Sequence, residues 1–179
     1  MALPDAASFW SGFTHPVLGV DHLTAMVAVG VVSARLGGWA LFGIPSVFVM
    51  AMAVGGTFGL NGWVLLNAEV WIAVSLVVLG AVVAVDPARR SAMPVFAAAM
   101  AVAFVAVFGG AHGNAHGLEI PTTARPLSFA VGFLIGTALL HLVGLAFGKL
   151  PGRWPWIATP VRIAGAFAMA LGGGMLMRS

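Results

Sequence analysis

The sequence predicts an all-α polytopic membrane protein, folded as one bundle of about six transmembrane helices. Composition is the first observation: 61% of the 179 residues are hydrophobic and only 7% are charged. A soluble domain carries charge at roughly a quarter of its positions. The mean hydropathy of +1.06 is the second. Breaks at charged and Pro/Gly clusters then divide the chain into six apolar segments, each near the length of about 20 residues that crosses a bilayer.

The six predicted spans cover residues 15–34, 39–60, 63–85, 94–111, 127–148 and 159–177. Pro16 is expected to kink a helical lead-in that begins near Asp5. Thr159 is a candidate N-cap for the sixth span, with Pro160 at the first helical position. Tryptophans fall at predicted span ends, which is typical of an aromatic belt: Trp39, Trp63, Trp154 and Trp156.

The distribution of lysine and arginine predicts the orientation. One side of the predicted bundle carries Arg35, Arg89, Arg90, Lys149, Arg153 and Arg162, and the other carries only Arg125 and Arg178. The positive-inside rule then places both termini and the stretch 112–119 away from the cytoplasm of a bacterial inner membrane. Residues 1–13 lack the usual signal-peptide pattern, so we expect either a native start here or a leader already removed.

Several other classes of protein are excluded by composition. A net charge of +3 would suit a nucleic-acid binder, but the eight Lys and Arg form no basic run longer than Arg89-Arg90. The chain has no cysteine, and therefore neither a disulfide nor a thiolate ligand. Glycines recur at four-residue spacing, which predicts close helix packing in lipid: Gly55 and Gly59, Gly109, Gly113 and Gly117, Gly132 and Gly136, and Gly144 and Gly148.

Ionisable side chains are concentrated at a few positions within the predicted spans. An ionisable residue in a membrane is costly and by default indicates a pathway or a site. The set contains every histidine of the chain: His15, Asp21 and His22 in the first span, Glu69 in the third, His112, His116 and Glu119 at the end of the fourth, and His141 in the fifth.

Spacing indicates how these residues would be grouped. His15 and His22 are seven apart and would share one helical face, two turns apart. His112, His116 and Glu119 follow an i, i+4, i+7 pattern, which would also share a face on a helix. The intervening glycines leave an unwound, cavity-lining segment as the alternative.

The predicted depths suggest a route for a cation. His15, Glu69 and the 112–119 stretch would lie near the outer surface, Asp21 and His22 deeper, and His141 past the midplane. Imidazole with carboxylate suits Ni, Co, Zn, Cu(II) or Fe(II), whereas Mg and Ca prefer oxygen ligands alone. Two other interpretations remain open: His141 as a hydrogen-bonded structural residue between helices, and Glu69 as a packing or gating residue.

Two sequence strings resemble the signature of the HupE/UreJ nickel permeases. HPVLGVDHLTAMVAVG has the H-x5-D-H core at His15, Asp21 and His22, and HGNAHGLE matches the H-G-x-A-H-G-x-E pattern with His112, His116 and Glu119. Weaker agreement surrounds Glu69 and His141. The resemblance implies nickel uptake for hydrogenase or urease maturation and a multi-pass inner-membrane protein. Some relatives are associated with cobalt. Family members usually carry a leader and often an N-terminal histidine, and this chain shows neither.

We therefore interpret the sequence as a permease for a divalent transition metal, with Ni²⁺ first and Co²⁺ as the alternative. The metal would be the transported substrate, and the chain would be neither an enzyme nor dependent on a catalytic cofactor. Two other classes remain open. One is an intramembrane zinc-dependent hydrolase, in which three His and an Asp hold the metal and activate water. The other is a bis-histidine haem electron carrier.

Overall fold

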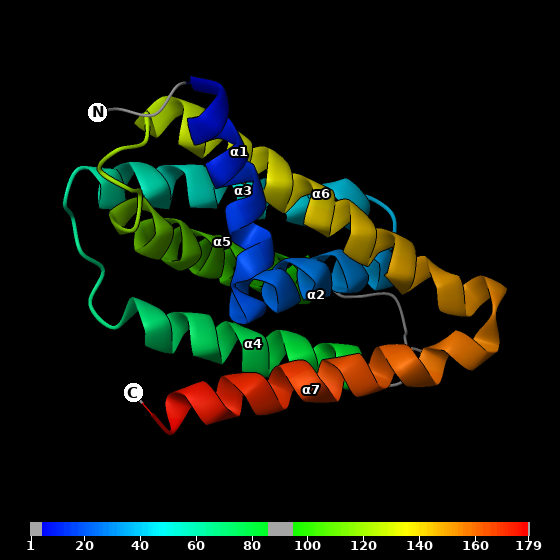
Figure 1. The fold of residues 1–179 in the computed structure, drawn as a ribbon. Helices are drawn as coiled ribbons and strands as arrows, with labels where there is room; N and C mark the ends of the chain where they lie inside the picture. Colours follow the sequence, from blue (N-terminus) through cyan, green and yellow to red (C-terminus); the bar gives the residue numbers. More distant parts are fainter. Residues whose placement is uncertain (1–4, 86–94, 179) are drawn as a thin grey trace.

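The structure is a computed structural model that describes residues 5–85 and 95–178, with the backbone alone for 95–98. Within these ranges the chain is helical and has no strand (Figure 1). The protein is thus a polytopic helical membrane protein, as predicted. Arg89, Arg90 and residue 94 lie outside the described residues. The elements are α1 (Asp5–Leu18), α2 (Val20–Leu36), α3 (Ala40–Leu60), α4 (Ala68–Ala84), α5 (Val95–Leu118), α6 (Pro126–Arg153), the 3₁₀ turn η2 (Pro155–Ile157) and α7 (Ala158–Leu176).

Each of the six predicted segments corresponds to a helix or a helix pair. Among the described residues, α3, α6 and the segment Pro155–Leu176 are each long and apolar enough to cross a bilayer. The pair α1 and α2 passes the same test as a broken span, and α4 is a shorter apolar helix of 17 residues. The start of α1 and the end of α7 lie on the same side of the bundle, at the left of Figure 1.

The first predicted span, 15–34, is not a continuous helix. The chain breaks at Gly19, where the backbone is extended (φ −87°, ψ 116°), and α1 and α2 meet at a bend of 80°. Pro16 removes a hydrogen-bond donor from the last turn of α1, and glycine is a poor helix former. The helix nevertheless continues through Leu18, so the bend falls at Gly19 rather than at the predicted Pro16.

Other predicted boundaries also needed correction. The helix predicted at 63–85 begins only at Ala68, after Asn67 in the left-handed region (φ 57°). The stretch 112–118 is helical, so the unwound alternative is wrong. α6 extends to Arg153, beyond the predicted end at 148. α7 begins at Ala158 with Ile157 as its N-cap, because the η2 turn already leads into the helix.

The bundle is assembled from close helix pairs. α3 packs on α5, and α4 packs on α7. α1 packs along the first half of α6, and α2 packs along its second half. The glycines predicted to allow close packing lie at these contacts. A Cβ added at Gly55 would overlap the carbonyl of Gly110, and one added at Gly113 would overlap the carbonyl of Met52. These contacts confirm the predicted packing role.

Two arginines connect the end of α4 to α2 and α7 through hydrogen bonds. Arg35 at the end of α2 donates hydrogen bonds to the carbonyls of Val82, Val83 and Val85. Arg162 of α7 donates to the carbonyl of Ala84. Because the last carbonyls of a helix have no partner within it, basic side chains stabilise this end of α4.

We expect the substitution Gly55→Ala to destabilise the protein in detergent by about 1–3 kcal/mol, because the new methyl must displace the backbone of α5. The measurement is thermal unfolding of both variants by circular dichroism. Gly174→Ala is the control, since no atom lies within 4 Å of an added Cβ there. Equal melting temperatures for the two variants would contradict the packing role of Gly55.

Candidate metal site

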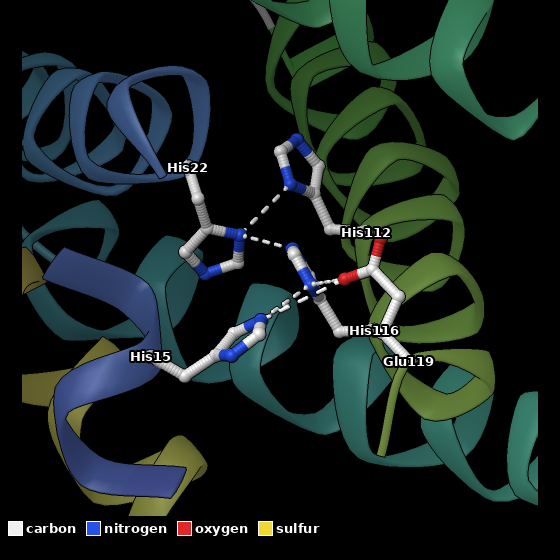
Figure 2. Close-up of polar contacts among 5 residues, drawn as sticks. All are labelled: His15, His22, His112, His116 and Glu119. Carbon is white, nitrogen blue, oxygen red and sulfur yellow. Dashed lines mark hydrogen bonds and ion pairs between the residues drawn. The ribbon is translucent and has the colours of Figure 1, made fainter. Parts of the chain in front are cut away.

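Four histidines and one glutamate meet where the break between α1 and α2 lies beside the end of α5 (Figure 2). His15 belongs to the last turn of α1 and His22 to the first turn of α2. His112 and His116 come from the end of α5, and Glu119 follows directly after it. The break at Gly19 is what allows the first two imidazoles to reach the same place. Both of them contact His116, instead of lying two turns apart on one helix as predicted.

Three of the imidazoles form a buried group: His22, His112 and His116. The Nδ1 atom of His22 lies 2.8 Å from Nε2 of His116 and 3.4 Å from Nδ1 of His112. One ligand atom from each residue lies within 4.8 Å of the others. Metal–imidazole bonds of about 2.0–2.1 Å keep ligand nitrogens roughly 3 Å apart. The spacing of these nitrogens therefore suits a single metal ion with little movement.

An outer group consists of His15, His116 and Glu119. Nδ1 of His116 lies 2.8 Å from Oε2 of Glu119 and 3.1 Å from Nε2 of His15. The distance from His15 Nε2 to Glu119 Oε2 is 3.6 Å. The hydrogen bond from His116 lowers the pKa of the Glu119 carboxyl below its usual range, although partial burial opposes the shift. The carboxylate is consequently charged at neutral pH and can attract a cation.

Hydrogen bonds set the tautomers of two histidines. Ser75 of α4 donates its hydroxyl hydrogen to the carbonyl of Ile72, so its oxygen can only accept from Nε2 of His112, which is 3.3 Å away. That bond leaves Nδ1 of His112 as a lone pair. The bond to Glu119 likewise leaves Nε2 of His116 as a lone pair. Both lone pairs accept from the Nδ1–H of His22, whose Nε2 has no hydrogen-bond partner among the described residues. A cation held by all three nitrogens would therefore take the place of that single proton.

Exposure decreases steadily from the outer group to the buried group. The side chains of Glu119, His15 and His116 are 57%, 30% and 14% exposed. His22 and His112 are 1% and 0% exposed. His116 belongs to both groups, with Nδ1 in the outer group and Nε2 in the buried one. The five residues thus form a continuous column of ligands from the surface to the core.

The other three predicted site residues lie outside both groups. Asp21 is half-buried in the first turn of α2, next to His22. Glu69 is exposed in the first turn of α4. A carboxylate near a helix N-terminus is stabilised by the helix dipole, so both positions are favourable for an acid even without a bound cation. His141 is buried in α6, where its ring packs edge-on against Phe48 with centroids 5.3 Å apart.

Sequence reasoning missed three residues that shape the site. Ser75 orients His112, and the ring of Phe133 packs against His15, His22 and His116. Asn114 accepts a hydrogen bond from Leu65 N and donates one to the carbonyl of Trp63, which anchors the loop before α4 to α5. Ser75 and Asn114 could have been found from the sequence, because each is a polar residue within an otherwise apolar helix.

The family model described as "HupE / UreJ protein" matches residues 2–175, nearly the whole chain. This chain belongs to the HupE/UreJ family. It is 38% identical over 168 residues to Protein HupE of Rhizobium leguminosarum bv. viciae, an alignment that covers 93% of this chain and 83% of that protein. No solved structure matches the chain significantly. The resemblance of the two histidine motifs to HupE/UreJ proteins is thereby confirmed.

We expect Ser75→Ala to weaken Ni²⁺ binding by about tenfold, because His112 loses the acceptor that fixes its tautomer. Isothermal titration of the purified protein with Ni²⁺ gives the affinity. Ser33→Ala is a matched control: Ser33 is equally buried and also bonds to a backbone carbonyl, that of Val29. Equal affinities of the two variants would show that Ser75 has no part in orienting the ligand.

Proposed function

We propose that this chain is a membrane permease that imports a divalent transition metal, with Ni²⁺ as the first substrate and Co²⁺ as the alternative. The observation that supports this most strongly is the column of ligands. Two groups of three ligands share His116, and the exposure of their side chains falls from the surface to the core. A stationary structural site would need only one such group, whereas a route for a cation needs successive ones.

In the proposed mechanism the ion first meets the outer group. The Glu119 carboxylate attracts the cation, and Nε2 of His15 replaces part of its hydration shell, while Nδ1 of His116 keeps the proton that it donates to Glu119. The ion then moves to the other side of the His116 ring, where Nε2 of that ring, His22 and His112 receive it. Because the His116 ring lies against both groups, the two sets of ligands are one imidazole apart. The charge of Asp21, beside His22, would offset the cost of dehydration.

The chemistry of the ligands narrows the substrate. Nitrogen ligands with one carboxylate suit Ni, Co, Zn, Cu(II) and Fe(II), and the absence of cysteine argues against Cu(I). The two motifs that resemble nickel permeases, together with HupE/UreJ membership, favour Ni²⁺ among these metals. In this proposal the metal is substrate, and the chain is not an enzyme and has no catalytic cofactor.

The membrane potential can supply the driving force. Moving one charge through 100 mV yields about 2.3 kcal/mol, so a divalent cation gains about 4.6 kcal/mol. That energy corresponds to a concentration ratio of more than about a thousandfold at equilibrium. Accumulation then requires no ATPase domain.

We place the protein in a bacterial inner membrane, with Glu119 on the outer side and both termini on that same side. Among the described residues, Arg35, Lys149, Arg153 and Arg162 lie at the opposite end of the bundle. The positive-inside rule makes that end cytoplasmic. Delivery of nickel to hydrogenase or urease maturation is the cellular role that the family resemblance implies.

We expect proteoliposomes that contain only this protein to take up radiolabelled Ni²⁺, and both Asp21→Asn and His22→Ala to reduce the initial rate by about tenfold or more. Leu18→Ala is the control, because Leu18 is exposed at the same helix break and holds no ligand atom. Wild-type rates in both variants would remove the proposed site. Absence of uptake by the wild type would instead favour the hydrolase alternative.

We also expect uptake to depend on the outside pH. Histidine has an ordinary pKa of about 6.5, and a protonated imidazole cannot bind a metal. Protons therefore compete with the metal, and the initial rate should fall as the outside becomes more acidic. Burial disfavours the charged form of an imidazole, so the fall is expected below about pH 6.5. The rate is measured between pH 4 and 8 at constant free Ni²⁺ and constant membrane potential. A rate that stays constant or rises on acidification would argue against histidine ligands on the route.

A further inference from the structure

His141 is a buried titratable residue that the column of ligands does not include. Its side chain is 1% exposed, and neither Nδ1 nor Nε2 has a hydrogen-bond partner within the described part of the chain. A buried polar group without a partner is costly and therefore rare in folded proteins. The interpretation of His141 as a hydrogen-bonded structural residue between helices finds no support in these contacts.

One aromatic ring separates His141 from the buried group. The ring centroid of Phe48 on α3 lies 5.7 Å from that of His112 and 5.3 Å from that of His141. Phe48 is itself 1% exposed. The imidazole of His141 is thus no more than one side chain away from the buried group.

Two further polar groups lie near His141 in α3. His141 lines an open groove between α3 and α6 together with Ser46, and the other lining residues are apolar, with Phe42 and Met50 among them exposed on the outside of the bundle. Pro45 has no N–H, which leaves the carbonyl of Leu41, one turn earlier in α3, without its usual helical donor. The Ser46 hydroxyl and this carbonyl are thus polar groups in a span that is otherwise apolar.

The position of this groove continues the direction of the column. It is formed by the first half of α3 and the second half of α6, and these halves lead to Arg35 and Arg153 at the basic end of the bundle. The outer and buried groups lie at the break between α1 and α2 and in the last turns of α5, away from that basic end. Phe48 contacts His112 of the one region and His141 of the other.

We propose that His141 is an additional metal-binding station on the cytoplasmic side of Phe48, which receives the divalent cation from the buried group. This inference rests on the proposed permease function and extends it by one step. The imidazole offers a nitrogen ligand to an ion that has passed Phe48. Phe48 then separates an outward-facing set of ligands from an inward-facing one.

The test compares uptake and binding in the same variants. His141→Leu removes the ligand while keeping an apolar side chain of similar size. It should reduce Ni²⁺ uptake into proteoliposomes by about tenfold or more, while Ni²⁺ affinity in titrations changes less than twofold, because the outer and buried groups remain intact. His141→Cys supplies another ligand atom at the same position in a chain without cysteine, and should recover part of the uptake.

Leu139→Ala is the matched control on α6, since Leu139 is exposed two residues away and should leave uptake unchanged. Wild-type uptake by His141→Leu would overturn the station. Loss of Ni²⁺ affinity together with uptake in His141→Leu would also overturn it, because His141 would then only support the structure of the other groups. Absence of uptake by the wild type, with binding retained, would overturn the proposed permease function itself.

Discussion

The two-sided contact of the His116 ring is the interaction on which the site depends. Nδ1 faces Glu119 and His15, and Nε2 faces His22, so one imidazole joins residues of α1, α2 and α5. Buried imidazoles without such partners would be costly in a bundle surrounded by lipid. Mutual contacts among the histidines reduce this cost, and they also hold the nitrogens at distances that suit a transition metal.

Two features of the backbone bring these rings together. Glycines on α5 and α3 allow the two helices to approach until backbone touches backbone, which fixes His112 and His116 relative to α3. The break at Gly19 then turns α2 away from α1, so that His15 contacts Nδ1 of His116 while His22 contacts Nε2 of the same ring. Membrane proteins tolerate a broken helix where it lines a site, because nearby protein satisfies the freed backbone groups.

Two independent observations support a role in metal transport: membership in the HupE/UreJ family and the geometry of the column of ligands. The family match depends on the similarity of the whole chain, whereas the column depends on distances between side chains. Ser75 and Phe133 belong to neither sequence motif, yet Ser75 fixes the tautomer of His112, and Phe133 packs against His22 and His116 of the buried group and His15 of the outer group. The ligand groups thus receive support from α4 and α6, which contribute no ligand themselves.

The sequence by itself determined the helical membrane fold, the glycine contacts and the residues of both groups, since hydropathy, four-residue spacing and rare ionisable side chains are local signals. It also predicted that His116 and Glu119 lie together, because they are three residues apart at the end of one helix. It grouped His112 with them, whereas the structure places His112 in the group of His22. Only the tertiary structure decided that His15 and His22 share one partner, that Glu69 stays apart and that Phe48 contacts both His112 and His141. These relations depend on how helices that are distant in sequence pack against one another and bend, and patterns in the sequence do not report such contacts.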